Sequence, residues 1–335
     1  MKIKAMKINV AVAGVGTMGQ SHARVYSELE EVNLVAVADT NQETGKLVAD
    51  RFGCKFYNNF ESLLDNESID AVSIVVPTSY HRQSAVLALK RGIATLVEKP
   101  LADTRDAALD IISAAQAQNT QLMVGHIERF NPAAAKLKEI VSQGQLGEII
   151  SIITRRVGIA PPRIKDASVI VDLGVHDIDI CNYLLGRQPD NIFASGGRAL
   201  INNREDYAHI FLQYGKANVF IQINWITPVK VRMLNVTGTK GYAELDYISQ
   251  RLMLYQTKID TTFDDYGDFI VKFGKPVTIE AEVQKQEPLK LEIEHFVKCV
   301  QNGSRPLVSG EEGLAALEIA LKAQQMCKKV RGDAK

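Results

Sequence analysis

Three polar side chains in this sequence have the types that acid–base chemistry at a hydroxyl group requires. Lys99 stands in L-V-E-K-P at 96–100, directly after an apolar run and before a proline. Asp172 and His176 lie four residues apart, and Asp179 follows His176 by three. On a helix these spacings place the three side chains on one face. An imidazole is suited to remove or return a proton near neutral pH, and either carboxylate is suited to orient it.

The backbone around the lysine indicates that its position is fixed. Pro100 restricts Lys99 to an extended conformation, and a cis bond between them would be a structural feature. A lysine beside another cation has a lowered pKa. It is then suited to hydrogen-bond or deprotonate a substrate hydroxyl. A surface salt bridge is the alternative for an isolated lysine. For the acids the alternative is a helix N-terminus, whose dipole favours Asp172 and Asp177 but does not explain His176.

A glycine-rich segment, V-A-V-A-G-V-G-T-M-G, occupies residues 10–19 after a predicted strand and at the start of a predicted helix. In such a motif the first glycine permits a tight turn and the second lets the backbone approach a pyrophosphate. The third lets the helix pack close to the strand. The diphosphate is expected at the helix N-terminus, where unpaired N–H groups favour anions. The predicted contacts are Gly14, Gly16, Thr17, Met18 and Gly19.

Two further segments are predicted to contact the same dinucleotide. Asp39 ends the next strand, twenty residues after Gly19, where a carboxylate accepts hydrogen bonds from a ribose diol. It also repels a 2′-phosphate, and no arginine follows it, which favours NAD over NADP. Thr78 and His81, after a later strand, are expected to touch the central or nicotinamide ribose. The alternative for His81 is an exposed residue at a helix start.

The first 124 residues alternate short apolar strands with helical stretches, which predicts βαβ units, a parallel sheet and right-handed crossovers. Expected strands are 8–13, 34–38, 55–57, 71–76, 94–97 and 122–124; expected helices are 17–30, 41–52, 60–66, 80–91 and 104–118.

After residue 125 the pattern changes to long β runs joined by short turns, which predicts a largely antiparallel sheet. Ser309 and Glu312 form a capping box ahead of the last helix. We therefore predict a doubly wound Rossmann domain over 1–124. An α+β domain on a large open, mostly antiparallel sheet is predicted over 125–335. Expected helices are 132–142, 175–185, 289–302 and 310–330; expected strands are 148–157, 191–200, 208–214, 218–226, 230–237, 241–246 and 251–255.

Composition excludes several partner classes. The 335 residues hold 39 Lys plus Arg and 39 Asp plus Glu, so a purely electrostatic partner such as nucleic acid or an anionic membrane is not expected. No apolar run reaches the length of a membrane span, and no export signal is apparent. The four cysteines show no C-x-x-C pair, which favours reduced thiols in a cytoplasm and no metal site. Met6 is an alternative start.

The ordered motifs G-V-G-T-M-G, V-E-K-P and D-L-G-V-H-D-I-D resemble the Gfo/Idh/MocA oxidoreductase family over nearly the whole chain. The resemblance implies a Rossmann domain with an open-sheet domain that often mediates oligomers, here a homodimer or homotetramer. It also implies a catalytic set of Lys99, Asp172 and His176, with Glu98 and Lys99 beside the cofactor. Reversible hydride transfer between a sugar's secondary alcohol and NAD is the expected reaction, with both lobes meeting over the nicotinamide. The segment before Asp172 departs from the glycine-rich pattern of many members.

Substrate identity is the least specified feature. The segments I-E-R-F-N-P and R-R-V-G…P-P-R resemble a nucleotide-sugar branch that oxidises UDP-N-acetylglucosamine at its 3-hydroxyl. Paired arginines suit a diphosphate, while arginines beside an edge strand also serve as solvated edge protection. The predicted substrate contacts are Arg129, Asn131, Arg156, Arg163, Asp172 and His176.

Three alternative functions remain open at this point. An inositol or free-sugar dehydrogenase is the alternative within the family. A non-catalytic NAD-binding sensor is the alternative outside catalysis, and the intact lysine, aspartate and histidine disfavour it. A methyltransferase with a similar glycine loop is disfavoured by the E-K-P segment. Pathway, favoured direction and oligomer size are not specified by the residues.

Overall fold

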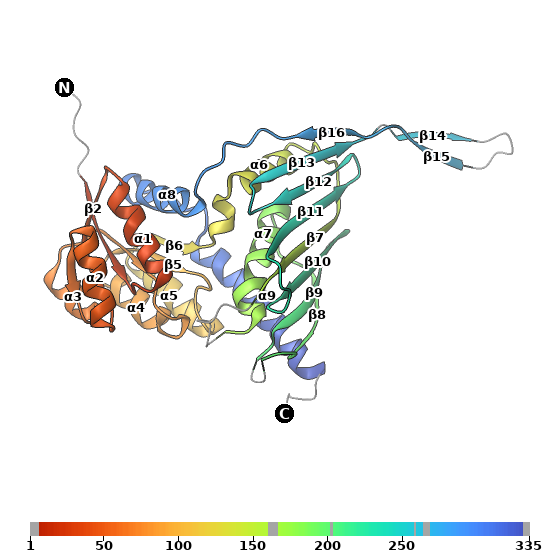
Figure 1. Ribbon diagram of the computed structural model, residues 1–335. Coiled ribbons are helices and arrows are strands. Elements are labelled where there is room, and N and C mark those ends of the chain that lie inside the picture. Colours follow the sequence, from red (N-terminus) through yellow and green to blue (C-terminus); the bar gives the residue numbers. More distant parts are fainter. Residues whose placement is uncertain (1–6, 160–166, 202–203, 258, 264–268, 331–335) are drawn as a thin grey trace, which may run out of the picture. The chain divides into compact units, whose positions relative to one another are not determined.

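The computed structural model describes residues 7–159, 167–201, 204–257, 259–263 and 269–330, and Figure 1 shows the elements. The chain forms two compact units that do not follow a single cut of the sequence. The first comprises Met1–Phe130 and Glu287–Leu321, and the second comprises Asn131–Gln286 and Lys322–Lys335. The predicted boundary at residue 124 therefore does not account for the return of the C-terminal helices to the first unit.

A six-stranded, fully parallel sheet forms the centre of the first unit, in the order β3-β2-β1-β4-β5-β6. In this order the chain reverses direction across the sheet between β1 and β4, where ligands of doubly wound folds bind. Valine, isoleucine, leucine and alanine fill the strands because both faces are covered. The strands are Ile8–Ala13, Val32–Ala38, Lys55–Tyr57, Ala71–Ile74, Ala94–Glu98 and Leu122–Gly125.

The crossover helices pack on the two faces of this sheet. Helices α1 and α2 contact each other on one face, and α3, α4 and α5 form a contiguous group on the other. Asn41, Asn59 and Thr104 cap α2, α3 and α5 by accepting a backbone N–H. The helices are Thr17–Glu28, Gln42–Phe52, Phe60–Asn66, His81–Leu89 and Arg105–Ala117, with a 3₁₀ turn η1 at Thr78–Tyr80 and another, η2, at Ile127–Phe130.

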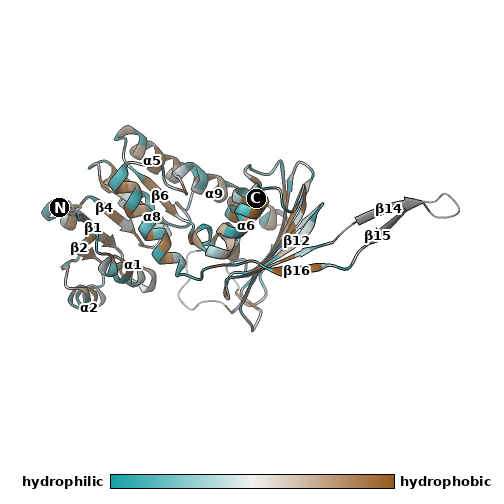
Figure 2. Ribbon diagram, turned by 90° about the horizontal axis from the view of Figure 1, so that it is seen from above, coloured by the Kyte–Doolittle hydropathy of each residue, from teal (hydrophilic) through white to brown (hydrophobic). Residues whose placement is uncertain are grey.

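Two C-terminal helices complete the first unit's core. Figure 2 shows hydrophilic and hydrophobic residues interleaved along α8, Pro288–Asn302. Its apolar stripe, Ile293, Phe296 and Val297, belongs to the same hydrophobic core as the parallel strands. Helix α9, Gly310–Val330, begins with the predicted capping box. The Ser309 N–H donates to Glu312 at 2.9 Å, and the Glu312 N–H donates to the Ser309 hydroxyl at 3.4 Å.

The second unit is built on an eight-stranded sheet in the order β16-β13-β12-β11-β7-β10-β9-β8. Neighbouring strands are antiparallel except β10 and β7, which confirms the predicted mostly antiparallel sheet. A separate two-stranded sheet pairs β14 with β15. The strands β7 to β16 are Ile149–Val157, Asn191–Gly197, Tyr207–Tyr214, Ala217–Asn224, Val231–Gly238, Gly241–Asp246, Arg251–Gln256, Ile259–Phe263, Phe269–Phe273 and Val277–Glu280.

Helices cover one face of this sheet. Helix α6, Pro132–Ser142, contacts β12 and β13, while α7, Val175–Leu185, contacts β7 and β10. A π-helical turn, η3, at Ile170–Gly174 leads directly into α7. Gly174 permits close packing because a Cβ there would lie 3.0 Å from the Ile223 side chain of β10. The side chains of alternate strand residues are buried beneath these helices.

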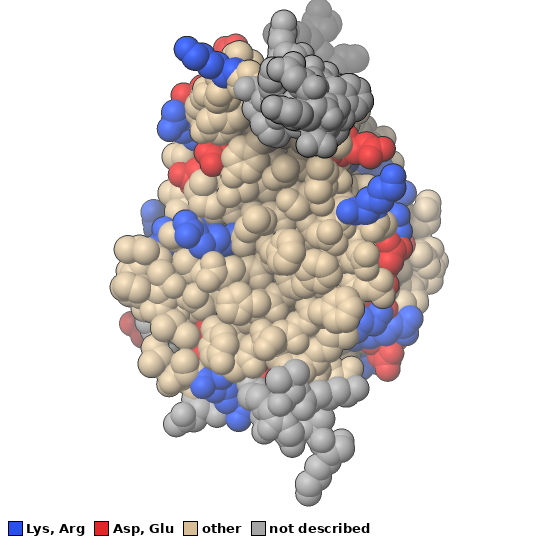
Figure 3. Space-filling view, turned by 90° about the vertical axis from the view of Figure 1, so that its right-hand side faces the viewer, with Lys and Arg blue, Asp and Glu red and all other residues tan. Residues whose placement is uncertain are grey.

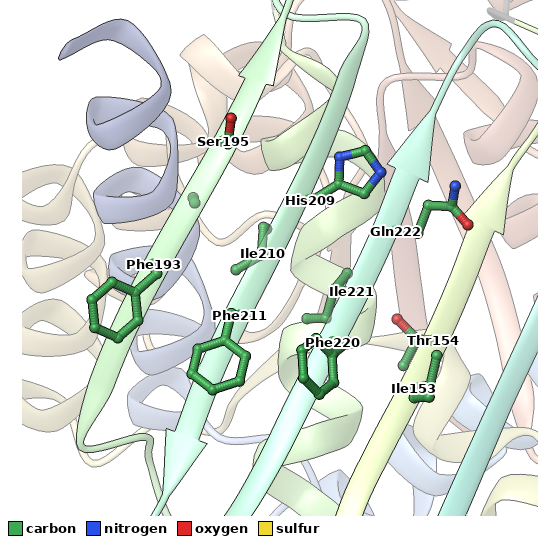
Figure 4. A pocket seen from close by; sticks show the side chains of 11 residues that line it. Ile153, Thr154, Phe193, Ser195, His209, Ile210, Phe211, Phe220, Ile221 and Gln222 are labelled. Carbon is green, nitrogen blue, oxygen red and sulfur yellow. The ribbon is translucent and has the colours of Figure 1, made fainter. Parts of the chain in front are cut away.

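The opposite face of the sheet carries an apolar row. Phe193, Phe211, Phe220 and Ile153 are register partners on β8, β9, β10 and β7, and Figure 4 shows their side chains side by side. The ring centroids are 5.9 Å apart for Phe193–Phe211 and 5.0 Å apart for Phe211–Phe220. Figure 3 shows this face largely uncharged, with lysine, arginine and acidic side chains toward its margins.

Several expectations differ from these elements. Strands β14, β15 and β16 and the π-helical turn were not predicted. The strand predicted over 71–76 ends at Ile74, because Val76–Tyr80 turns away into η1. The strand predicted over 191–200 ends at Gly197, where Asp206 accepts the N–H groups of Ala199 and Leu200. Among the described residues, no helix is long and apolar enough to cross a lipid bilayer.

Candidate active site

Close backbone contacts shape the glycine loop after β1. Gly14 has φ +87°, and a Cβ there would lie 2.6 Å from the Val75 carbonyl oxygen after β4. A Cβ on Gly19 would lie 1.9 Å from the Gly14 carbonyl oxygen. Both glycines are therefore required by the fold itself. They hold the start of α1 against the carboxyl end of β1.

Gly16 has the opposite environment. It is exposed, a Cβ there would meet nothing within 4 Å, and it is the N-cap of α1. No side chain caps this helix, and its first turn holds no acidic residue. The N–H groups of Thr17 and Met18 therefore point toward a helix start without a side-chain acceptor. An open, uncapped helix N-terminus fits a dinucleotide diphosphate.

Asp39 at the end of β2 braces this loop. One carboxylate oxygen accepts the Val15 N–H at 2.7 Å, and the other accepts the Asn41 N–H at 2.8 Å. Each oxygen retains a lone pair that could accept a ribose hydroxyl. The side chain is half-buried and lies beside the glycine loop.

Thr78 and His81 differ in what they offer a ligand. Thr78 is half-exposed at the start of η1, beyond the end of β4. His81 is 1% exposed, so the alternative of a surface residue is wrong. Its Nε2 lies 2.9 Å from the Val76 carbonyl oxygen and its Nδ1 lies 3.0 Å from that of Pro100. Burial lowers the pKa of His81, against the effect of these carbonyls. The ring ties together the segments that follow β4 and β5.

Lys99 lies at the carboxyl end of β5, half-buried, and its bond to Pro100 is cis. A chain of buried polar groups supports the residue before it. Glu98 accepts the Lys99 N–H at 3.1 Å, and its other oxygen lies 3.1 Å from His22 Nε2. Ser73 Oγ lies 3.1 Å from His22 Nδ1 and 2.8 Å from the Tyr26 hydroxyl. Glu98, predicted to contact the cofactor, is thus a support for the Lys99 backbone.

The sequence prediction did not include His22, Ser73 and Tyr26. A signal was present in the spacing. His22 lies three residues after Gly19, and Tyr26 lies seven residues after Gly19, so both lie on the same side of α1 as Gly19, the side that faces the sheet. A polar residue on the buried face of an otherwise apolar helix requires a partner. The identity of that partner depends on β4 and β5, which the local sequence does not reveal.

Asp172 and His176 form the second part of the candidate site. Between Ser168 and Cys181 they are the only two residues that are not buried. Asp172 lies in the π-helical turn and His176 in the first turn of α7. π-Helical turns frequently occur at functional sites. The apolar residues around the pair are buried, so the helix presents two chemically competent side chains on a rigid support.

The other acids of this helix are buried. Asp179 is 1% exposed. Burial of Cys181 and Tyr214 is the main cause of their raised pKa values, and the negative charge of Asp179 is a smaller cause. Asp177 is also 1% exposed and holds Arg156 through both carboxylate oxygens, at 3.0 and 3.2 Å. Asp177 does lie in the first turn of α7, as the helix-dipole alternative expected, and it is also the partner of a buried arginine. Asp172, not Asp179, shares the part-exposed position of His176.

Three predicted substrate contacts have structural partners instead. Arg156 is 4% exposed, paired with Asp177 and stacked 5.2 Å from the Tyr247 ring. Arg129 is 3% exposed and donates to Glu312 at 2.7 Å and to the Leu307 carbonyl oxygen. Asn131 caps α6 and donates to the Tyr247 carbonyl oxygen. Arg163 lies outside the described residues.

Two models of one protein family match consecutive parts of the chain. Residues 8–126 match the family model described as an oxidoreductase family with an NAD-binding Rossmann fold. Residues 138–332 match the companion model of the same family, described as its C-terminal alpha/beta domain. Together the two matches cover nearly all the described elements.

The relatives that are similar to this chain are named for different substrates. The chain is 28% identical to UDP-N-acetylglucosamine 3-dehydrogenase of Acidithiobacillus ferrooxidans, over 95% of this chain and 96% of the relative. It is also 28% identical to scyllo-inositol 2-dehydrogenase (NAD(+)) of Bacillus subtilis, over 95% and 93%. A solved structure of the Acidithiobacillus enzyme superposes with a TM-score of 0.85 at 26% identity, covering 97% of this chain and 99% of that one.

Substitutions at Gly16 and Gly19 should separate cofactor binding from stability, because the two glycines have opposite environments. Gly16→Ala adds a methyl group where nothing obstructs it, so thermal unfolding stays close to wild type while NADH binding weakens by about tenfold or more. Gly19→Ala forces the helix away from Gly14 and lowers the unfolding temperature as well. Differential scanning fluorimetry and NADH fluorescence titration measure the two effects. Equal NADH affinity in Gly16→Ala and wild type would contradict a diphosphate at this helix start.

Proposed function

Because the chain belongs to the Gfo/Idh/MocA oxidoreductase family, we propose that it is an NAD-dependent dehydrogenase acting on a sugar's secondary hydroxyl. The observation that carries this proposal is the exposure pattern of one helix, where only Asp172 and His176 escape burial between Ser168 and Cys181. A binding module without catalysis has no need of a part-exposed acid–imidazole pair in an otherwise buried segment. The same family motifs supply Lys99 at a strand end.

NAD, when bound, supplies the hydride acceptor, and the chain's residues perform the remaining work. Gly16 and the first turn of α1 hold the diphosphate, and Asp39 holds the adenosine ribose. His176 takes the hydroxyl proton as general base, and Asp172 orients its imidazole. Lys99 stabilises the negative charge that develops on the same oxygen. In the reverse direction His176 returns the proton.

The preferred substrate is a UDP-N-acetylglucosamine-type nucleotide sugar, oxidised at its 3-hydroxyl. Similarity to UDP-N-acetylglucosamine 3-dehydrogenase over nearly the full length of both chains supports this assignment. A specific observation favours an inositol as the second candidate. Arg129 and Arg156, expected to bind a diphosphate, are buried against Glu312 and Asp177, and an inositol-acting relative is equally identical.

A substrate panel separates these candidates. We expect NADH formation with NAD⁺ and UDP-N-acetylglucosamine, and a kcat/KM at least about tenfold lower with myo-inositol, scyllo-inositol or glucose. NADP⁺ should support slower turnover because its 2′-phosphate meets the Asp39 carboxylate. Turnover with inositols alone would replace the nucleotide-sugar assignment. Tightly bound NAD must be removed or recycled with a keto acid before the assay.

Removal of the proposed acid–base groups tests the catalytic roles. Lys99→Met and His176→Asn should each lower kcat by about 10²- to 10⁴-fold while NADH affinity changes little. Lys90→Met is a matched control, because Lys90 is exposed at the end of α4 on the same unit as Lys99. Loss of NADH binding in both active-site variants, with turnover per bound NAD retained, would identify them as cofactor anchors instead.

The open face of the large sheet is the proposed contact between copies of the chain, as a homodimer or homotetramer. Phe193, Phe220 and Ile153 are each about half exposed, at 58%, 48% and 49%. A row of three aromatic rings and an isoleucine on one sheet face forms a contiguous apolar patch (Figures 3 and 4). Monomeric proteins rarely expose such patches, since covering them is favourable.

Charge substitution in this row should dissociate the assembly. We expect Phe220→Asp to reduce the mass measured by size-exclusion chromatography with light scattering to that of one chain, because a carboxylate resists burial in an apolar interface. Leu47→Asp is the matched control, as Leu47 is 64% exposed on α2 of the other unit. An unchanged mass for Phe220→Asp, or a monomeric wild-type protein, would contradict this interface.

A further inference from the structure

Glu292 on α8 is buried beneath the support of Lys99 without a partner among the described residues. Its side chain is 0% exposed, and neither carboxylate oxygen has a hydrogen bond. An ionised carboxylate in such a place is unusual, because burial without hydrogen bonds strongly disfavours the charged form. This acid lies outside the glycine loop and outside every motif that the sequence singled out.

A second acid lies next to it. One ligand atom each of His22, Glu98 and Glu292 can be chosen so that the three lie within 4.8 Å of one another. Glu98 already has two donors, since it accepts the Lys99 N–H and faces His22 Nε2. Of the two acids, Glu98 therefore has the hydrogen bonds that a negative charge requires, and Glu292 has none.

We infer that Glu292 carries a proton in the native protein and, with Glu98, forms a buried pair that shares one negative charge. Protonated Glu292 then has an O–H to direct toward the Glu98 carboxylate, whereas an ionised Glu292 would need donors that the described residues do not supply. In this arrangement α8 positions Glu98, and Glu98 positions the backbone of Lys99. Glu292 is a positioning residue, and that role rests on the proposed function, whereas its protonation does not.

The charged groups around Glu292 agree with this assignment. Burial, and then the negative charge of Glu98, raise the pKa of Glu292 well above its ordinary value. Burial opposes ionisation of Glu98 too, but His22 and Lys99 outweigh it and lower its pKa. The elements with the most contacts to α8 are α1 and η2, and Glu98 at the end of β5 also reaches Glu292. The titratable groups of these elements are His22, Arg24, Tyr26 and Glu28 on α1 and Glu128 and Arg129 on η2, with His126 just before η2 and Lys290, Glu294, His295, Lys298 and Cys299 on α8 itself.

The nearby cations have other partners. Arg24 pairs with Glu28 and Glu287 at the surface, and Arg129 pairs with Glu312. Tyr26 is buried, burial raises the pKa of its hydroxyl, and Glu292 adds to that shift. A divalent metal is the competing explanation for His22, Glu98 and Glu292, but His22 Nε2 faces Glu98 directly at a hydrogen-bond distance.

The sign of the pH dependence follows from the proton count. Above about pH 5 an unfolded glutamate has lost its proton, whereas native Glu292 keeps it. The folded state then binds one more proton than the unfolded state, so stability is greatest at low pH and falls as pH rises toward the folded-state pKa. Each pH unit in that window raises the unfolding constant by about tenfold relative to a protein without the group.

Urea unfolding of wild type and Glu292→Gln between about pH 6 and pH 8 tests the protonation. We expect the logarithm of the unfolding constant to rise by about one more unit per pH unit in the wild type than in Glu292→Gln. Glu294→Gln, on the same helix but half-exposed, should keep the wild-type slope. Equal slopes for wild type and Glu292→Gln would show that native Glu292 is ionised and would overturn the inference.

Two measurements on the intact wild-type protein protect the test against a variant that fails to fold. Infrared difference spectroscopy at about pH 7.5 should show the C=O band of a protonated carboxyl group. Absence of that band overturns the inference. One equivalent of divalent metal in the purified protein by mass spectrometry, displaced with loss of stability by a chelator, also overturns it in favour of a metal site.

The positioning role has its own readout. Glu292→Leu should lower kcat by about 10- to 100-fold because Lys99 loses its alignment, while Glu292→Gln, which keeps a neutral donor, restores kcat to near wild type. The pH profile of kcat in Glu292→Gln should match the wild type, since no charge has been removed. A shifted profile would contradict a neutral Glu292. If wild type turns over no sugar, the proposed function fails while the unfolding slopes still decide the protonation.

Discussion

The contact between Gly19 and the Gly14 carbonyl oxygen sets the depth at which α1 lies on the parallel sheet. No side chain larger than hydrogen fits between helix and loop, since a Cβ on Gly19 would be 1.9 Å from that oxygen. At this depth the next two sheet-facing positions, His22 and Tyr26, reach Ser73 on β4. His22 also reaches Glu98 at the end of β5, and Glu98 accepts the N–H of Lys99.

One helix therefore supports two sites at the carboxyl edge of the parallel sheet. Its N-terminus is an open donor site beside Gly16, and its buried face supports the backbone of the lysine two strands away. A buried hydrogen-bond chain of this kind is strong only when each member has a partner, because an unsatisfied polar group in a low-dielectric core is costly. A change in the depth of α1 would disturb both the cofactor loop and the Lys99 loop.

Much of this fold was predictable from local pattern. The parallel strands have runs of branched aliphatic residues, the glycine loop has its three positions in order, and the capping box at Ser309 is explicit. The π-helical turn was not predictable, because periodicity does not distinguish one widened turn from a regular helix. The attachment of α8 was not predictable either, since an amphipathic stripe shows that a helix packs but not against which core.

Arg129, Asn131 and Arg156 show that residue type alone does not reveal the partner of a side chain. A guanidinium suits a diphosphate, but it suits a buried carboxylate equally well, and the choice depends on whether an acid lies in reach. Asp177 follows Arg156 by 21 residues, and Glu312 follows Arg129 by 183, so neither partner is recognisable from the local segment. Asn131 precedes Pro132 at a helix start, and that local signal would have identified the cap.

Asp172 and His176 contrast with these residues for a physical reason. A buried ion pair such as Arg156–Asp177 satisfies its own charges and fixes α7 against β7. Asp172 and His176 retain part of their surface, whereas the other residues between Ser168 and Cys181 are buried. Catalysis requires a proton acceptor that is held rigidly and still accessible. In the mechanism that we propose, the buried Arg156–Asp177 pair supplies the rigidity, and the surface left to His176 supplies the access.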